Sequence, residues 1–168
     1  MNALIGTKFK VIEGFKGGTE INLAMERGEV HARSNVWSSW KSQKGDWLRE
    51  KKIVHLVQVG PKARDLDVPS FLDLVSGDKA RAMVEFLHIN LQMGRSVYAT
   101  PGMPAARVAA LRNAFMETMR DKAYLKEMAA KKMDVEPVPG AALQAYVRKA
   151  VATPKEVVSA VNQALGVK

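Results

Sequence analysis

Cysteine is absent from the 168 residues of this chain, which excludes disulfide bonds, thiol nucleophiles and iron–sulfur clusters. Motifs for metal binding and catalysis are absent as well. The three histidines, His31, His55 and His88, are too far apart in sequence to form a metal-binding motif. The chain has no Gly-x-Ser-x-Gly element, and no Ser-His-Asp arrangement can be inferred. We therefore expect no enzyme, no metal ion and no cofactor; a small hydrolase or transferase is the least favoured function.

Long apolar runs are also missing. No stretch approaches the roughly 18 apolar residues that predict a transmembrane helix. The N-terminus, Met1–Lys8, lacks a basic region followed by an apolar run, which is the pattern of a signal peptide. If Met1 is the true start, this pattern places the chain in the cytoplasm.

Acidic residues are few relative to basic ones. The chain has 26 Lys and Arg against 17 Asp and Glu, a net charge of +9. Residues 1–60 carry a balance of +4 and residues 61–168 one of +5, so the excess is spread evenly. The densest basic cluster, Arg49–Lys52, is short. Such diffuse charge indicates general attraction of anions more than a nucleic-acid-reading surface. A basic nucleic-acid-binding module remains the alternative function, which a steep salt dependence of DNA affinity would identify.

The residues that are present predict alternating strands and helices. Hydrophobic residues make up 47% and charged residues 26%, as in an ordinary globular protein. The strongest predicted strand is 53–59, which is almost continuously apolar and rich in β-branched residues. Alternation of strands and helices in the first part favours a parallel α/β sheet, with mostly helix in the last 65 residues. The other predicted strands cover residues 9–12, 30–33 and 95–99. The predicted helices cover about 2–5, 20–27, 36–50, 70–74, 78–93, a stretch after Pro104, one from Asp121, 140–152 and 154–165.

A glycine-rich turn is the most informative local feature. Gly17, Gly18 and Thr19 stand between a predicted strand and a predicted helix. Free backbone N–H groups at a helix N-terminus attract carboxylate or phosphate, and glycine lets a ligand approach the backbone. The turn matches neither a Rossmann nor a Walker motif. It therefore predicts either an anion site or a tight turn that only requires glycine.

A second polar pair follows the predicted strand 30–33. Ser34 and Asn35 come directly after it, and ligands in open α/β sheets bind beyond the carboxyl ends of strands. The two side chains could contact a ligand there, with Trp37 or Trp40 as a wall. The alternative is a helix cap followed by core tryptophans.

The order of these pieces resembles the solute-binding proteins of tripartite tricarboxylate transporters, the Bug family. The resemblance begins in Asn2–Val30, which contains the Gly17-Gly18-Thr19 turn. It continues through Trp37–Trp40, the predicted strand 53–59 and Asp67–Pro69. It ends in Pro101–Ala105 and the following helix Arg107–Arg112. His31 departs from the pattern, which usually has Asp there.

The resemblance implies a fold, a function and a location. The fold would be the parallel-sheet lobe of a type II periplasmic-binding-protein-like protein at 1–93, followed at 94–168 by a crossover and C-terminal helices. The function would be binding of a small carboxylate for membrane transporter subunits in the periplasm, without catalysis and without nucleic acid. By position, Gly17, Gly18 and Thr19 would face the ligand's distal carboxylate, and Ser34 and Asn35 would lie on the same side of the cleft.

The chain covers only about the C-terminal half of a usual member of that family. A first lobe and a signal peptide would therefore precede Met1. The helices beyond residue 104 would pack on that missing lobe, so alone they would expose an apolar face. Such a face favours self-association. We expect the isolated chain to be either a non-functional truncated relic or an oligomer that buries this face.

Overall fold

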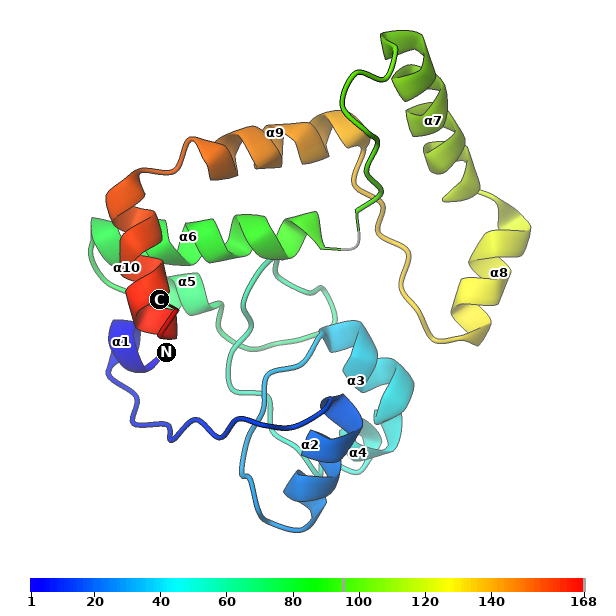
Figure 1. The fold of residues 1–168 in the computed structure, drawn as a ribbon. Helices are drawn as coiled ribbons and strands as arrows, with labels where there is room; N and C mark the ends of the chain where they lie inside the picture. Colours follow the sequence, from blue (N-terminus) through cyan, green and yellow to red (C-terminus); the bar gives the residue numbers. More distant parts are fainter. Residues whose placement is uncertain (95, 168) are drawn as a thin grey trace. The chain divides into compact units, whose positions relative to one another are not determined.

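The computed structural model describes residues 1–94 and 96–167, and these residues form helices joined by extended and irregular segments (Figure 1). The chain divides into two compact units, Met1–Val54 and His55–Lys168. The first unit contains α1 (Asn2–Ile5), α2 (Gly18–Glu26), α3 (Trp37–Gln43) and α4 (Gly45–Arg49). The second contains α5 (Phe71–Leu74), α6 (Asp78–Met93), α7 (Ala105–Thr118), α8 (Lys122–Ala130), α9 (Gly140–Val151) and α10 (Lys155–Leu165).

The predicted parallel α/β sheet is wrong for the described chain. No sheet forms among residues 1–94 and 96–167, so the parallel-sheet lobe of a type II periplasmic-binding-protein-like fold is absent. The predicted strands 9–12, 30–33 and 53–59 are not in strands, and neither are residues 96–99; Arg95 lies outside the described residues. The nearest approach to a sheet is an isolated parallel bridge between Gln58 and Ser70.

The physical reason lies in what strand propensity measures. β-branched residues favour a strand because they fit a pleated, half-buried surface beside other strands. The predicted strands instead leave large apolar side chains exposed, as at Val11 (73%), Val54 (80%) and Val97 (78%). These side chains are not covered by a neighbouring strand, so their β-propensity does not produce a strand here.

The helices begin close to where the sequence predicts them because their start signals are local. Ser70 Oγ accepts a hydrogen bond from the backbone N–H of Leu72 at 3.3 Å, which caps α5. Asp121 Oδ1 accepts one from the N–H of Tyr124 at 2.8 Å, which caps α8. Side-chain oxygens at these positions satisfy N–H groups that a helix start leaves without partners. Gly6 closes α1 in a left-handed conformation, with φ of 67°.

The first unit has a small core around two tryptophans. Trp40 in α3 and Trp47 in α4 are each only 6% exposed, and their ring centroids are 6.1 Å apart. Ala24 and Asn22 of α2 are buried in the same unit. The predicted helix 36–50 is in fact two helices, because the backbone at Lys44 leaves the helical region.

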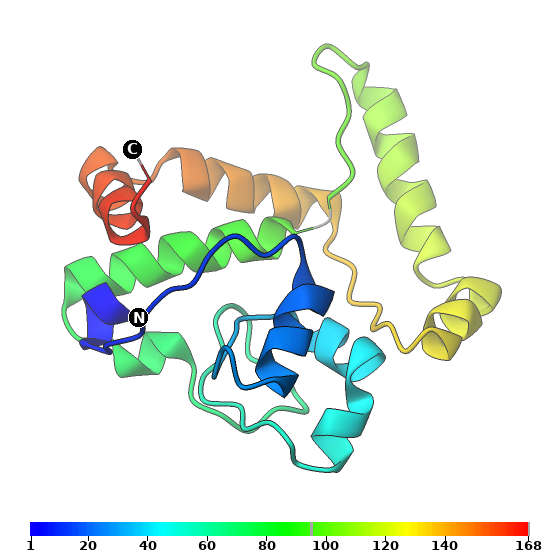
Figure 2. The ribbon, with the colours of Figure 1, turned by 60° about the horizontal axis from the view of Figure 1, so that its bottom comes forward.

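The second unit is organised around α6. Helix α9 runs alongside α6, and α10 crosses near one end of it (Figures 1 and 2). The buried side chains include Val84 of α6, which is fully inaccessible, and Val157 and Val161 of α10. The last helix is strongly amphipathic because its apolar residues recur at helical spacing.

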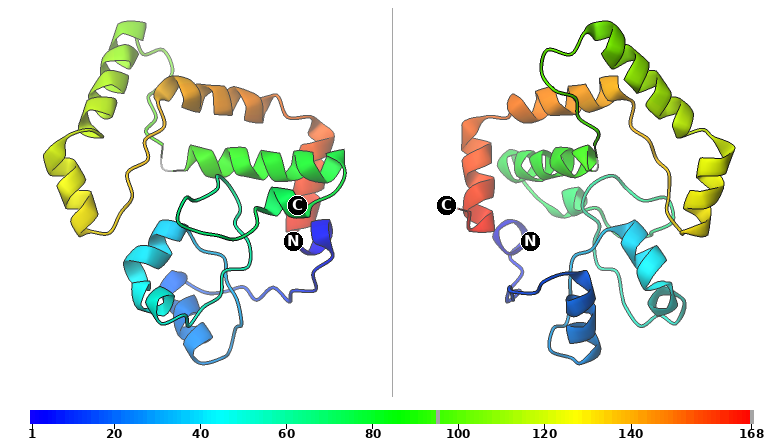
Figure 3. Two further views of the ribbon diagram at one scale, coloured as in Figure 1. Left: turned by 180° about the vertical axis from the view of Figure 1, so that it is seen from behind. Right: turned by 45° about the vertical axis from the view of Figure 1, so that its right-hand side comes forward.

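Helices α7 and α8 contribute no buried residue to this core. Figure 3 shows the two helices extending away from the α6–α9 pair. Leu111 of α7 is 56% exposed. Arg112 of α7 contacts α9, because its Nη2 donates a hydrogen bond to Gln144 Oε1 at 2.9 Å.

Among the described residues, no helix combines the length and apolar character needed to cross a bilayer.

Candidate functional site

The start of α2 offers backbone donors without a side-chain cap. Gly17 is the N-cap residue, and no side chain caps the helix. Within residues 1–94 and 96–167, the N–H groups of Gly18, Thr19 and Glu20 meet no acceptor. Gly17 has a φ of 172°, an extended conformation that any residue adopts. The helix start therefore presents several N–H groups and the positive end of the helix dipole to an anion.

Arg33 reaches this helix start from the segment that follows α2. Its Nη1 donates to the carbonyl oxygen of Gly18 at 2.6 Å and to Asn22 Oδ1 at 2.8 Å. Its Nε donates to the carbonyl oxygen of Ser34 at 3.2 Å. The guanidinium also lies 5.5 Å from the ring centroid of Trp40. These contacts fix the guanidinium beside the first turn of α2.

The glycine at position 18 has a specific steric role. A Cβ placed on Gly18 would lie 3.1 Å from both Nη1 and Nη2 of Arg33. This distance is closer than ordinary van der Waals contact, so the guanidinium would have to shift by a few tenths of an ångström to admit a Cβ. By contrast, a Cβ on Gly17 would meet no atom within 4 Å. The close approach of Arg33 therefore involves Gly18 and not Gly17.

The electrostatics of this corner favour an anion. The guanidinium is a cation at the positive end of a helix, an arrangement that the helix dipole disfavours. Burial lowers the pKa of Arg33, but arginine stays protonated in proteins. Within the described chain Arg33 forms no ion pair with a carboxylate. The acidic residue in the first turn is Glu20, whose Oε2 accepts a hydrogen bond from the N–H of Lys16 at 2.6 Å.

The remaining donors define what a ligand could contact. A guanidinium has five N–H groups; the contacts of Arg33 use Nε and both hydrogens of Nη1. Among the described residues, Nη2 is left without an acceptor, so a ligand oxygen would approach Arg33 through one nitrogen rather than two. The uncapped N–H groups of Gly18 and Thr19 provide donors for a second oxygen. A carboxylate, with two oxygens on one carbon, suits such a divided set.

The structure places the predicted site residues in two segments joined by Arg33. Gly17, Gly18 and Thr19 form the start of α2, and Ser34 and Asn35 precede α3. Gly18 and Ser34 both contact the Arg33 guanidinium through their carbonyl oxygens. In the described chain, the side chains of Thr19 and Asn35 form no hydrogen bond.

The sequence pattern does not identify Arg33 as a site residue. Arg33 ends a predicted strand, and nothing in the pattern connects it with the glycine turn. The available signal was a single cation directly before the polar pair Ser34 and Asn35. Its partner, Gly18, is 15 residues earlier, and only the fold brings the two together.

The histidines do not form a comparable site. Burial lowers the pKa of His55. Burial likewise lowers the pKa of His88, against a smaller opposing effect of Glu85. His55 lies in the predicted strand 53–59, but it is not in a sheet, because no sheet forms in the described chain. The described residues contain no group of three or more His, Asp or Glu side chains that could hold a metal ion.

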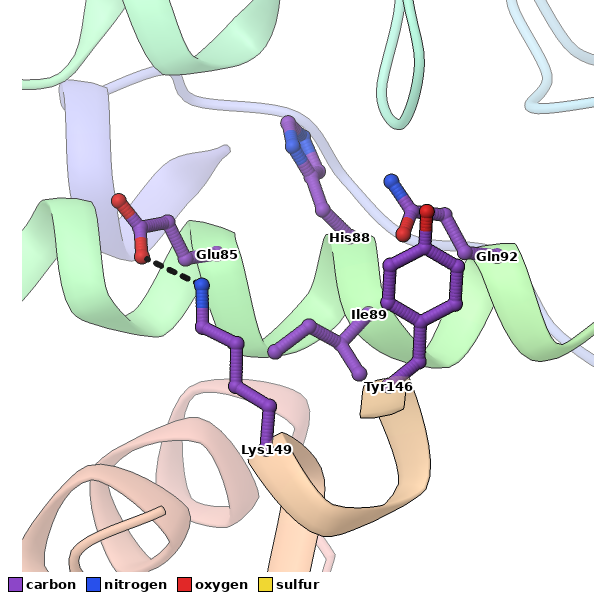
Figure 4. A pocket seen from close by; sticks show the side chains of 6 residues that line it. All are labelled: Glu85, His88, Ile89, Gln92, Tyr146 and Lys149. Atoms are coloured by element: carbon purple, nitrogen blue, oxygen red, sulfur yellow. Dashed lines mark ion pairs between the residues drawn. The ribbon is translucent and has the colours of Figure 1, made fainter. Parts of the chain in front are cut away.

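A shallow pocket of about 240 Å³ lies between α6 and α9. Figure 4 shows an ion pair of Glu85 and Lys149, 3.5 Å apart, at one end and Tyr146 beside Gln92 at the other. His88 points away from α9 in the same view. Glu85 and Lys149 are half or more exposed. The pocket thus offers a charge pair already matched within the protein.

The chain matches no protein-family model, curated protein or solved structure with which it was compared. The resemblance to the Bug family stays a prediction.

Proposed function

We propose that the chain binds a small carboxylate at the N-terminus of α2. The observation that carries this proposal is the placement of the Arg33 guanidinium against Gly18, beside uncapped N–H groups and without a carboxylate partner in the described chain. A carboxylate there would accept hydrogen bonds from Nη2 of Arg33 and from the first-turn N–H groups. It would also relieve the unfavourable placement of a cation at the positive end of the helix.

The contacts available set the expected affinity. A charge-assisted hydrogen bond contributes about 1.5–3 kcal/mol, and a helix N-terminus adds about 0.3–1 kcal/mol. A dissociation constant of 1 mM corresponds to about 4 kcal/mol. Together these contributions are about 2–4 kcal/mol, so we expect a dissociation constant from about 1 mM to tens of millimolar for this surface alone.

The chemistry is recognition, and the role we propose is that of a solute-binding component of a transport system. Support comes from the resemblance to solute-binding proteins of tripartite tricarboxylate transporters and from the anion-binding character of the α2 start. In that role the chain would act in the periplasm and deliver its ligand to membrane subunits of the transporter.

Intrinsic fluorescence provides a direct test. All three tryptophans, Trp37, Trp40 and Trp47, are in the first unit, and Trp40 lies 5.5 Å from Arg33. Binding at the α2 start should therefore shift the emission. We expect a saturable change with acetate, succinate or citrate at constant ionic strength. The neutral amide acetamide is the matched control, and an equal response to acetamide would refute carboxylate recognition.

The buried tryptophans Trp40 and Trp47 give no support to the nucleic-acid alternative. Lysine and arginine side chains do lie over aromatic rings, as Lys44 does 4.4 Å from the Trp47 centroid. However, Trp40 and Trp47 are each only 6% exposed, so neither ring is available to stack on a base. Base stacking on exposed aromatic rings is a main source of single-strand affinity.

A further inference from the structure

Asn22 is a buried polar side chain beside the proposed carboxylate site. It belongs to the second turn of α2 and is only 4% exposed. An asparagine amide has four hydrogen-bonding positions, two donor hydrogens on Nδ2 and two acceptor positions on Oδ1. Buried amides normally have partners for their polar atoms, so the contacts of Asn22 indicate what its side chain does in the folded chain.

Among the residues that the structure describes, only the oxygen of this amide has a partner. Asn22 Oδ1 accepts a hydrogen bond from Nη1 of Arg33 at 2.8 Å, and Nδ2 meets no acceptor. A guanidinium can only donate, so the contact fixes which end of the amide faces Arg33. A buried donor without an acceptor costs free energy, and an oxygen of a ligand bound at Arg33 would recover it.

The same nitrogen of Arg33 has a second acceptor one helical turn away. Nη1 also donates to the carbonyl oxygen of Gly18 at 2.6 Å, and residues four apart lie on the same side of a helix. Two acceptors on α2 therefore hold one end of the planar guanidinium. Because this group is rigid, fixing Nη1 also fixes the direction of Nη2, the nitrogen that the proposed ligand would contact.

Both acceptors of Nη1 are neutral, so they orient Arg33 without cancelling its charge. A carboxylate in the place of the Asn22 amide would accept the same hydrogen bond as one half of an ion pair. Its negative charge would then offset the positive potential that attracts a ligand anion. Asparagine and aspartate have nearly the same shape, so the difference between them at position 22 is one of charge and of the Nδ2 donor.

We propose that Asn22 determines the anion affinity of the α2 start in two ways. Its Oδ1 positions Arg33 and leaves the guanidinium charge available, and its Nδ2 donates a hydrogen bond to the bound carboxylate. This role rests on the carboxylate binding proposed above and adds the side chain that controls it.

The test compares Asn22→Asp with Asn22→Ala in the full-length chain. Aspartate keeps the acceptor for Arg33 but neutralises the cation, whereas alanine removes the acceptor and leaves the charge. We therefore expect weaker succinate binding for Asn22→Asp than for Asn22→Ala, although Asn22→Asp should be the more stable of the two. A merely structural role of Asn22 predicts the opposite order of affinities, because alanine would then cause the larger damage.

Tryptophan fluorescence at constant ionic strength measures the affinities, and urea denaturation measures the stabilities. For Asn22→Asp we expect a loss of at least about tenfold in succinate affinity, because a charge-assisted hydrogen bond contributes that factor or more. The matched control is Gln43→Glu, which makes the same change of charge at an exposed position of α3 in the first unit. The control should change the affinity by less than about twofold, since water and salt weaken the effect of an exposed charge.

A second measurement uses the unsubstituted chain and does not depend on the folding of any variant. Nitrogen–proton correlation NMR detects the side-chain amide of Asn22 directly. On titration with succinate, its Nδ2 signals should shift saturably, with the dissociation constant that fluorescence gives. Signals that stay in place at saturating succinate would overturn the role of Asn22.

These results separate the role of Asn22 from carboxylate binding itself. If the unsubstituted chain does not bind succinate, both proposals fail. If it binds succinate and Asn22→Asp loses no more affinity than Gln43→Glu, carboxylate binding stands and the role of Asn22 fails. The role fails in the same way if Asn22→Ala binds succinate more weakly than Asn22→Asp.

Discussion

Replacing Arg33 with glutamine should weaken carboxylate binding much more than replacing any other cation of the first unit. Glutamine removes the charge and the Nη2 donor that the proposed ligand would contact. A charge-assisted hydrogen bond contributes about 1.5–3 kcal/mol, which corresponds to a loss of about 10- to 150-fold in affinity. Arg33→Lys keeps the charge but not the planar group that contacts Gly18 and Asn22 together, so its loss should be intermediate.

The same substitution carries a stability cost that can be measured separately. Arg33 donates to Asn22 Oδ1 at 2.8 Å, and Asn22 is only 4% exposed. Leaving this buried amide oxygen without its partner should cost about 1–3 kcal/mol in the free energy of unfolding. Urea denaturation followed by tryptophan fluorescence measures this cost and identifies the conditions under which the variant remains folded.

The assay compares dissociation constants for succinate under those folded conditions, with Arg27→Gln as the matched control. Arg27 also belongs to the α2 region, but it lies at the other end of the helix, where its side chain is 61% exposed and 3.8 Å from Glu29. The control should change the affinity by less than about twofold, because exposed pairs contribute little. Equal losses for the two folded variants would refute the argument, since they would show that only the net charge matters.

Three further predictions follow from the same contacts. Glu20→Gln removes the carboxylate that competes with a ligand at the α2 start, and a helix N-terminus favours an anion by about 0.3–1 kcal/mol. Succinate binding measured by isothermal titration calorimetry should therefore become about two- to fivefold stronger. Unchanged or weaker binding would contradict this role of Glu20. Gly18→Ala should weaken succinate binding in the same assay, since the new Cβ would lie 3.1 Å from the Arg33 nitrogens; an alanine variant with full affinity would show that the guanidinium position is unimportant. Because burial lowers the pKa values of His55 and His88, the unfolded chain should take up protons first as pH falls below about 6.5, the ordinary histidine value. Stability to urea should therefore be full above that pH and decrease below it, and His88→Asn should reduce the decrease; an identical pH profile for the variant would exclude His88 as a cause.

The helices could be predicted because their signals are local. Ser70 and Asp121 cap helices with their own side chains, and Gly94 follows α6 directly. The sheet could not be predicted correctly because strand propensity says nothing about the presence of a neighbour. Ile53–Val59 has the residues of a strand, but its neighbour in the described chain is a single bridging residue, Ser70. Pairing depends on distant segments, and the sequence pattern alone does not identify them.

The candidate site divides in the same way. The turn at Gly17–Thr19 could be predicted, since a glycine pair before a helix leaves N–H groups uncapped whatever the rest of the fold does. Arg33 could not, because its role depends on a contact with Gly18 that only the folded first unit creates. Ser34 contributes its backbone oxygen, which accepts a hydrogen bond from Arg33. Ligand contact by Ser34 and Asn35 stays a prediction.

Selectivity is the remaining question for this site, because an uncapped helix start beside a cation attracts any small anion. Chloride, phosphate and sulfate would all be drawn to the same positive potential. Discrimination must come from directionality. The donors are one nitrogen of Arg33 and the N–H groups of Gly18 and Thr19, which belong to two different parts of the chain. We expect a ligand with two or more oxygens, such as a carboxylate, phosphate or sulfate, to use both sets, whereas a single chloride cannot. A bound carboxylate should also stabilise the first unit by about 1.4 kcal/mol when its free concentration is tenfold above the dissociation constant. If chloride at equal ionic strength gave the same stabilisation as succinate, charge rather than geometry would explain the binding, and the assignment to carboxylates would fail.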